Sequence, residues 1–135
     1  MQAIVTATPI YAALLVLLFI KLTLNVVKAR RAARVAIGDG GNPTLQRAIA
    51  VHNNFAQYVP LGLVLMVLIE LQHAPIFLTH ALGVALLLGR GLHAYGVSQA
   101  QENFSLRKRG MLLTIGMLVT AALFLLGNSV YLAFS

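Results

Sequence analysis

Long runs of hydrophobic residues divide the chain into four segments that are separated by polar connections. The apolar runs cover residues 8–27, 55–71, 76–97 and 110–134. A helix needs about 20 consecutive apolar residues to cross the hydrocarbon core of a bilayer, and each run is near that length. The pattern therefore predicts an all-α fold, a bundle of four transmembrane helices. No repeat or shift in composition marks a boundary, so residues 1–135 are predicted to form a single membrane domain.

The second helix is predicted to begin well before its apolar run. Asn42 and Pro43 are typical of a helix start, with asparagine as the N-cap and proline at the first helical position. Residues 44–57 would then form a polar first half of this helix. Pro60 follows as an expected kink, which transmembrane helices tolerate because neighbouring groups satisfy the freed backbone carbonyl.

Composition supports a membrane protein. Of 135 residues, 59% are hydrophobic and 10% are charged, whereas about a quarter of the residues in a soluble domain are charged. Ten lysines and arginines against three acidic residues give a formal net charge of +7. This excess would suggest nucleic-acid binding in a soluble protein. Here the basic residues cluster beside apolar runs, where they direct membrane topology, so no nucleic-acid partner is expected.

The distribution of positive charge predicts the orientation of the chain. Lysine and arginine concentrate in the first and third connections, at residues 28–34 and 107–109, and are absent from the short second connection at 72–75. The positive-inside rule places the two basic connections in the cytoplasm and both termini on the other side. The first apolar run does not look like a secretory signal, because its positive charges follow the run rather than precede it.

Metal chemistry is not predicted. The chain contains no cysteine, so any thiol chemistry requires a thiol that a ligand supplies. His52, His73 and His80 do not lie at metal-ligand spacing with a carboxylate partner and are predicted to be structural. Glu70, at the outer end of the second span, is expected to lie at the membrane interface.

A polar stripe follows one face of the predicted second helix. Arg47, Ala50, Asn54 and Gln57 are three or four residues apart, which places them on one side of a helix, and Tyr58 lies beside them. An arginine with two amides can bind a carboxylate or a peptide-like ligand. The stripe could equally be a solvated extension of the helix or a contact with another helix, and spacing alone leaves these interpretations open.

Two further polar groups lie inside the apolar runs. Arg90 and His93 are one turn apart near the end of the third run, where they could bind an anion or snorkel towards the basic connection. Lys21, Asn25 and Lys28 share one face of the first helix. They could line a polar cleft, or the lysines could snorkel to the cytoplasmic interface.

The cluster Arg107, Lys108 and Arg109 precedes the fourth run directly. Such clusters usually determine topology. One of the three side chains could also point into a cleft between helices.

Several segments together resemble a known family. The strings GDGGNPTLQRAIAVHNNFAQYVPLGLVL, IELQHAP and LLLGRGLHAYG are similar to those of the MAPEG family, the membrane-associated proteins in eicosanoid and glutathione metabolism. The resemblance covers nearly the whole chain and indicates a bacterial member, which implies a location in the inner membrane. It also implies a homotrimer that binds glutathione between adjacent protomers near the cytoplasmic side. Many members conjugate glutathione to lipophilic electrophiles, reduce lipid peroxides or isomerise lipids.

The resemblance also assigns candidate site residues. It implies that the following residues bind glutathione: Arg47, Asn54, Gln57, Tyr58, Arg90 and His93. Arg109, or alternatively Arg107, lies where the family places an arginine that stabilises the glutathione thiolate. The physical basis is that a thiol has a pKa of about 8.5, and a nearby guanidinium favours its thiolate at neutral pH.

Three positions depart from the family pattern. Gln57 replaces a glutamate that contacts the glutathione amine, Ala50 replaces an arginine for a glutathione carboxylate, and Val97 replaces a tyrosine. The changes remove one anion, one cation and one phenol from the expected site. They bear on glutathione chemistry much more than on the fold.

Two functions from different classes therefore remain. The first is glutathione-dependent transferase or peroxidase activity on lipophilic substrates drawn from the surrounding lipid. The second is a catalytically silent trimer that binds a lipid or a partner protein. Small multidrug transport is disfavoured, because proton-coupled export of cations needs a carboxylate within the membrane and the first apolar run has none.

Overall fold

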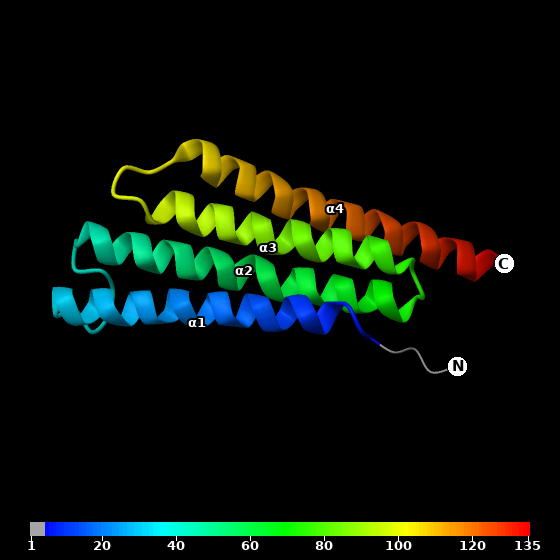
Figure 1. Ribbon diagram of the computed structural model, residues 1–135, viewed down its shortest axis with the longest axis horizontal. Helices are drawn as coiled ribbons and strands as arrows, with labels where there is room; N and C mark the ends of the chain where they lie inside the picture. The colour runs from blue at the N-terminus through cyan, green and yellow to red at the C-terminus, as the bar shows by residue number, and fades with distance from the viewer. Residues whose placement is uncertain (1–4) are drawn as a thin grey trace.

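The computed structural model describes residues 5–135 and shows four long helices packed side by side (Figure 1). The helices are α1 (Thr8–Ala33), α2 (Pro43–Leu71), α3 (Ile76–Ser98) and α4 (Phe104–Phe134). All four are long and apolar enough to cross a membrane. Even α3, with 23 residues, is roughly 35 Å long, which exceeds a hydrocarbon core of about 30 Å. The predicted all-α four-helix bundle is thus confirmed.

The helices begin where polar caps satisfy their first backbone N–H groups. The Asn42 side chain accepts a hydrogen bond from the Leu45 N–H at 3.0 Å, which confirms the predicted start of α2. A second cap was not predicted. Asn103 accepts from the Leu106 N–H at 3.1 Å, so α4 begins at Phe104 and its first two turns include the basic residues 107–109.

Neighbouring helices in the sequence are also neighbours in space. α2 packs against each of the others, α3 packs most extensively against α4, and α1 and α4 do not meet within residues 5–135. The close α3–α4 contact requires glycine at Gly110, where an added Cβ would lie 2.5 Å from the Gly89 carbonyl oxygen and from the His93 backbone nitrogen. Because both neighbouring atoms belong to the backbone, a larger residue would push the two helices apart.

The antiparallel arrangement separates the charges of the two ends. The start of α1, the α2–α3 turn and the end of α4 lie together, and the two longer connections lie at the opposite end (Figure 1). Lysine and arginine occur only in the half that contains these connections, with Lys21 the residue nearest the middle of α1. The other end carries a single carboxylate, that of Glu70.

Glu70 is buried within the bundle rather than exposed at its rim. Its residue is 8% exposed, and its carboxylate accepts hydrogen bonds of 2.8 Å from the backbone N–H groups of Thr6, Ala7 and Thr8. The first N–H groups of a helix have no partner inside the helix and carry the positive end of its dipole. The carboxylate of α2 therefore closes the start of α1.

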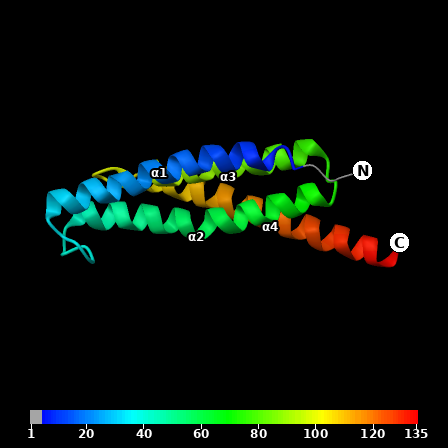
Figure 2. The ribbon, with the colours of Figure 1, turned by 90° about the horizontal axis from the view of Figure 1, so that it is seen from below.

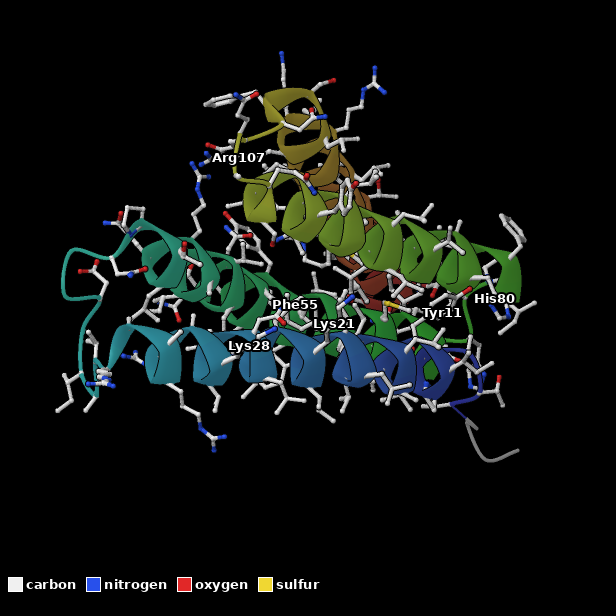
Figure 3. The ribbon with its side chains drawn as sticks, turned by 60° about the vertical axis from the view of Figure 1, so that its left-hand side comes forward. Tyr11, Lys21, Lys28, Phe55, His80 and Arg107 are labelled. Carbon is white, nitrogen blue, oxygen red and sulfur yellow. The ribbon has the colours of Figure 1, made fainter. Side chains whose placement is uncertain are left out.

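Two histidines link α1 to its neighbours. His52 Nε2 lies 3.1 Å from Thr23 Oγ1; this hydroxyl donates its proton to the Phe19 carbonyl at 3.0 Å, so the imidazole is the donor in the pair. At the other end, the Tyr11 hydroxyl lies 3.0 Å from His80 Nδ1 (Figure 3). Both pairs join α1 to another helix and act structurally, as the sequence predicted.

The outward faces of the helices are strongly apolar. Exposed side chains include Leu17, Phe77, Leu88 and Leu126, and the C-terminal end of α4 runs away from the other helices (Figure 2). A soluble monomer rarely exposes such continuous apolar surface. These faces fit contact with lipid or with another membrane helix.

Candidate functional site

A cavity of about 390 Å³ opens between α2, α3 and the first turns of α4, at the end of the bundle that holds the basic connections. We call it the α2–α4 cavity. Its lining consists of Pro43, Gln46, Arg47, Ala50, Asn54, His93, Val97, Glu102 and Arg107. Of the residues that the sequence assigned to a site, Arg47, Asn54, His93 and Arg107 meet here. They come from three helices, and the bundle brings them to one cavity.

An ion-pair cluster stands at the mouth of this cavity. Glu102 pairs with Arg107 at 2.6 Å and lies 3.9 Å from Arg47, measured between guanidinium nitrogen and carboxylate oxygen. Arg47 also donates to the Val97 carbonyl at 3.2 Å. Figure 3 places Arg107 on the side of α4 that is turned towards α2. Two guanidinium groups around one carboxylate leave an excess of positive charge that attracts an anion.

Sequence reasoning did not find Glu102. The chain has three acidic residues, and Glu102 is the one that lies in the basic third connection. This position could have indicated that Glu102 pairs with a cation. An acid in such surroundings has cations as its nearest neighbours. Its partners Arg47 and Arg107 come from α2 and α4, and only the packed bundle brings these helices to either side of Glu102.

Arg90 lies behind the cavity wall and does not line it. The residue is 1% exposed. Its guanidinium donates to Thr114 Oγ1 at 2.9 Å, to the Asn54 side-chain oxygen and to Met111 Sδ at 3.2 Å. It also lies over the Tyr58 ring, 5.2 Å from the ring centroid. No carboxylate in residues 5–135 pairs with it.

Arg90 and Tyr58 therefore act on the cavity through Asn54. Arg90 fixes the direction of the Asn54 amide, and the Tyr58 ring supports the guanidinium from α2. The resemblance implies that both residues contact the ligand directly. In this protomer their side chains hold the wall in place, and the direct contact stays a prediction.

Gln57 and Arg109 lie outside the cavity. Both are exposed, and neither is part of its lining. Arg109 follows Arg107 by two residues, which turns it about 200° around the helix axis. Of the two arginines considered for the thiolate, the structure brings Arg107 to the α2–α4 cavity.

Two of the three positions that depart from the family pattern belong to the cavity wall. Ala50 and Val97 both line it, and Ala50 is exposed. A larger side chain at position 50 would thus project into the cavity without displacing the helices. His93, which is 5% exposed, forms the adjoining part of the wall on α3.

The arrangement suits the recognition of a polar anion. It offers guanidinium groups, an amide and an imidazole, which together can bind carboxylate and peptide groups. Within residues 5–135, no group of three histidine, cysteine or acidic side chains could hold a metal ion. A reactive thiol would have to come from the ligand, since the chain has no cysteine.

Comparison with known proteins gives the family. Residues 8–127, which include the whole of α1, α2 and α3 and most of α4, match the MAPEG family. The inner membrane protein YecN of Escherichia coli strain K12 is 41% identical over 102 residues, which are 76% of each chain. YecN of Escherichia coli O6:H1 strain CFT073 gives the same identity and coverage. The resemblance inferred from the GDGGNPT and GRGLHAYG segments is confirmed, and the chain belongs to the MAPEG family of membrane proteins.

Proposed function

We propose that the α2–α4 cavity binds glutathione and that the protein uses this thiol on lipophilic substrates, as a transferase or a peroxidase. The observation that carries the proposal is that Arg47, Asn54, His93 and Arg107 line the same cavity in a chain of the MAPEG family. The volume of about 390 Å³ is within the range of small-molecule sites, roughly 300–1,000 Å³.

Different residues of the cavity wall bind glutathione and activate its thiol. Arg47 faces a glutathione carboxylate, and the Asn54 amide, held by Arg90, bonds to the peptide backbone. Arg107 stabilises the thiolate, since a guanidinium near a thiol favours its charged form. The bilayer concentrates the apolar substrate, and the site holds both reactants within reach of each other. The ligand carboxylate then replaces Glu102 as the partner of Arg47, and the thiolate replaces Glu102 as the partner of Arg107.

Titration of the purified protein with glutathione tests this function. Arg47→Ala is expected to weaken binding at least tenfold, because the loss of an arginine that pairs with a desolvated carboxylate costs about 2–5 kcal/mol. Arg31→Ala is the matched control, since Arg31 is exposed on α1 and does not line the cavity. This change should alter the free energy of glutathione binding by about 1 kcal/mol at most. Equal losses in both variants would contradict a site at Arg47.

The silent trimer remains the second candidate. It is favoured by Ala50 and Val97 in the cavity wall and by Glu102, which already occupies the mouth arginines. The double variant Ala50→Arg with Gln57→Glu restores the family pattern, and most of its effect is expected from position 50, which lines the cavity. If the wild type fails to bind glutathione at millimolar concentration and the double variant binds it, the silent trimer replaces the enzyme.

A homotrimer is part of the proposal. Its support is the family together with the apolar outward faces, which one protomer leaves uncovered. Small residues in α4, among them Gly116 and Ala122, allow close approach of another helix. We expect native mass spectrometry in mild detergent to show a trimer. Monomers or dimers alone would count against it.

The proposed location is a bacterial inner membrane, as the name of YecN states for that protein. We propose that both ends of the chain lie outside the cytoplasm; the support is that the two basic connections lie together at one end of the bundle. A reporter that is active only in the cytoplasm should therefore be inactive when fused after Ser135. Activity of that fusion would reverse the orientation.

A further inference from the structure

A second and larger cavity lies on the other side of Arg47, between α1, α2 and the end of α3. Its volume is about 530 Å³, and we call it the α1–α3 cleft. α1 and α3 are joined near Tyr11 and His80, and Figure 3 shows α3 running away from α1 towards the basic connections. The divergence leaves the cleft open between these two helices, with α2 as its floor.

The cleft contains cations and no anions. Its polar lining residues are Asn25, Lys28, Thr44, Arg47 and Ser98. None of the acidic residues of the chain belongs to the lining, and neither Lys28 nor Lys21 has an ion pair within residues 5–135. Lys28 comes from α1 and Arg47 from α2, and both line the cleft. The lining of the cleft is therefore positive; Arg47 lies 3.9 Å from Glu102 outside the lining, and Lys28 has no ion pair within residues 5–135.

The same cleft has an apolar interior. Leu22 and Ala29 of α1 and Ala48 and Val51 of α2 form its deeper surface. Lys21 lies on the same side of α1 as Lys28 (Figure 3), seven residues closer to the middle of the helix, which is roughly 10 Å further from the basic end. Positive charge near the interface and apolar walls below it fit an amphiphile with an anionic head.

We propose that the α1–α3 cleft binds the phosphate headgroup of an anionic phospholipid. Lys28 contacts the phosphate, Arg47 adds positive charge from the border with the α2–α4 cavity, and an acyl chain follows the apolar residues of α1 and α2 that line the cleft. A lipid is favoured over a soluble anion because Leu22, which lines the cleft, belongs to the apolar run of the first span, which a soluble anion does not enter. The site is separate from the proposed glutathione site, and only Pro43 and Arg47 border both cavities.

Lipid retention by the purified full-length chain tests the proposal. The delipidated protein is offered phosphatidylglycerol or phosphatidylcholine with identical acyl chains, and bound lipid is counted by native mass spectrometry. Phosphatidylglycerol should be retained preferentially. Lys28→Gln should reduce its retention about fivefold, the effect of one lysine at an anionic lipid surface.

Two further variants separate a cleft from general surface charge. Lys108→Gln removes the same charge from an exposed position on α4 that lines neither cavity, and it should leave retention unchanged. Ala32→Phe fills the cleft from an exposed position in its lining without changing any charge, and it should reduce retention as Lys28→Gln does.

Several results of these lipid-retention experiments would contradict a lipid site in the α1–α3 cleft. Equal retention of both lipids, or equal losses in Lys28→Gln and Lys108→Gln, would overturn the proposal. Displacement of phosphatidylglycerol by millimolar inorganic phosphate would assign the cleft to a free anion instead. Lys28→Gln and Ala32→Phe should both keep the glutathione affinity of the wild type. A protein that retains phosphatidylglycerol but fails to bind glutathione would lose the proposed enzyme function and keep this lipid site.

Discussion

Replacing Glu70 with alanine is expected to lower the free energy of unfolding by about 2–5 kcal/mol, the range for removing charged hydrogen bonds and a helix-end charge. The carboxylate accepts hydrogen bonds of 2.8 Å from the N–H groups of Thr6, Ala7 and Thr8. Without it, the N–H groups of the buried residues Ala7 and Thr8 lose their partner, and the attachment of α1 to α2 at this end weakens.

Thermal unfolding in detergent measures the effect, and hydrogen exchange locates it. Exchange should accelerate most at the amides of Thr8 and its neighbours in the first turn of α1. Glu70→Gln keeps the shape of the side chain but has one acceptor oxygen and no charge. Its unfolding temperature should therefore lie between those of the wild type and Glu70→Ala. Glu102→Ala is the control, because its ion pair is exposed and such pairs contribute about 0–1 kcal/mol. Equal unfolding temperatures for Glu70→Ala and Glu102→Ala would contradict the role of Glu70.

The fold could be predicted from hydropathy because each helix must satisfy its own backbone in lipid. The cap at Asn42 and Pro43 was likewise readable, since it depends on local chemistry. For the fourth segment the sequence predicted only the apolar run 110–134, whereas α4 begins at Phe104. Hydropathy falls sharply at the basic cluster 107–109, so the helical residues before 110 carry no apolar signal.

The face of α4 that packs against the other helices decides whether Arg107 or Arg109 reaches the α2–α4 cavity. Gly110, Thr114, Met117 and Ala121 are the buried residues of α4, and they repeat at the spacing of a helix face. Arg107 lies near this face. The sequence alone left Arg107 and Arg109 as alternatives, although this stripe of mostly small residues could have separated them.

Partners from distant helices could not be predicted. Glu70 closes a helix that begins 62 residues earlier, and Glu102 meets an arginine of α2. Arg90 and Asn54, which are 36 residues apart, were each assigned to a ligand because spacing shows which face a residue is on. It does not show which other helix covers that face.

Arg90 gives the second large expected effect. Arg90→Ala should lower the free energy of unfolding by about 2–4 kcal/mol, because it leaves a void in a packed interior and buried acceptors without donors. It should also weaken glutathione binding, since Asn54 loses the donor that fixes its amide. Arg47→Ala should weaken binding alone, because Arg47 is only partly buried at the cavity mouth. Thermal unfolding in detergent and glutathione titration of both variants separate the two roles.

Arg90→Met distinguishes packing from hydrogen bonding. Methionine fills much of the same volume without a charge, and it adapts to irregular space, so most of the stability lost in Arg90→Ala should return. The affinity for glutathione should not return, because methionine cannot donate to Asn54 or Thr114. Recovery of both properties would show that Arg90 acts by filling space alone. An unfolding temperature of Arg90→Ala equal to that of the wild type would exclude the buried guanidinium as a link between α2, α3 and α4.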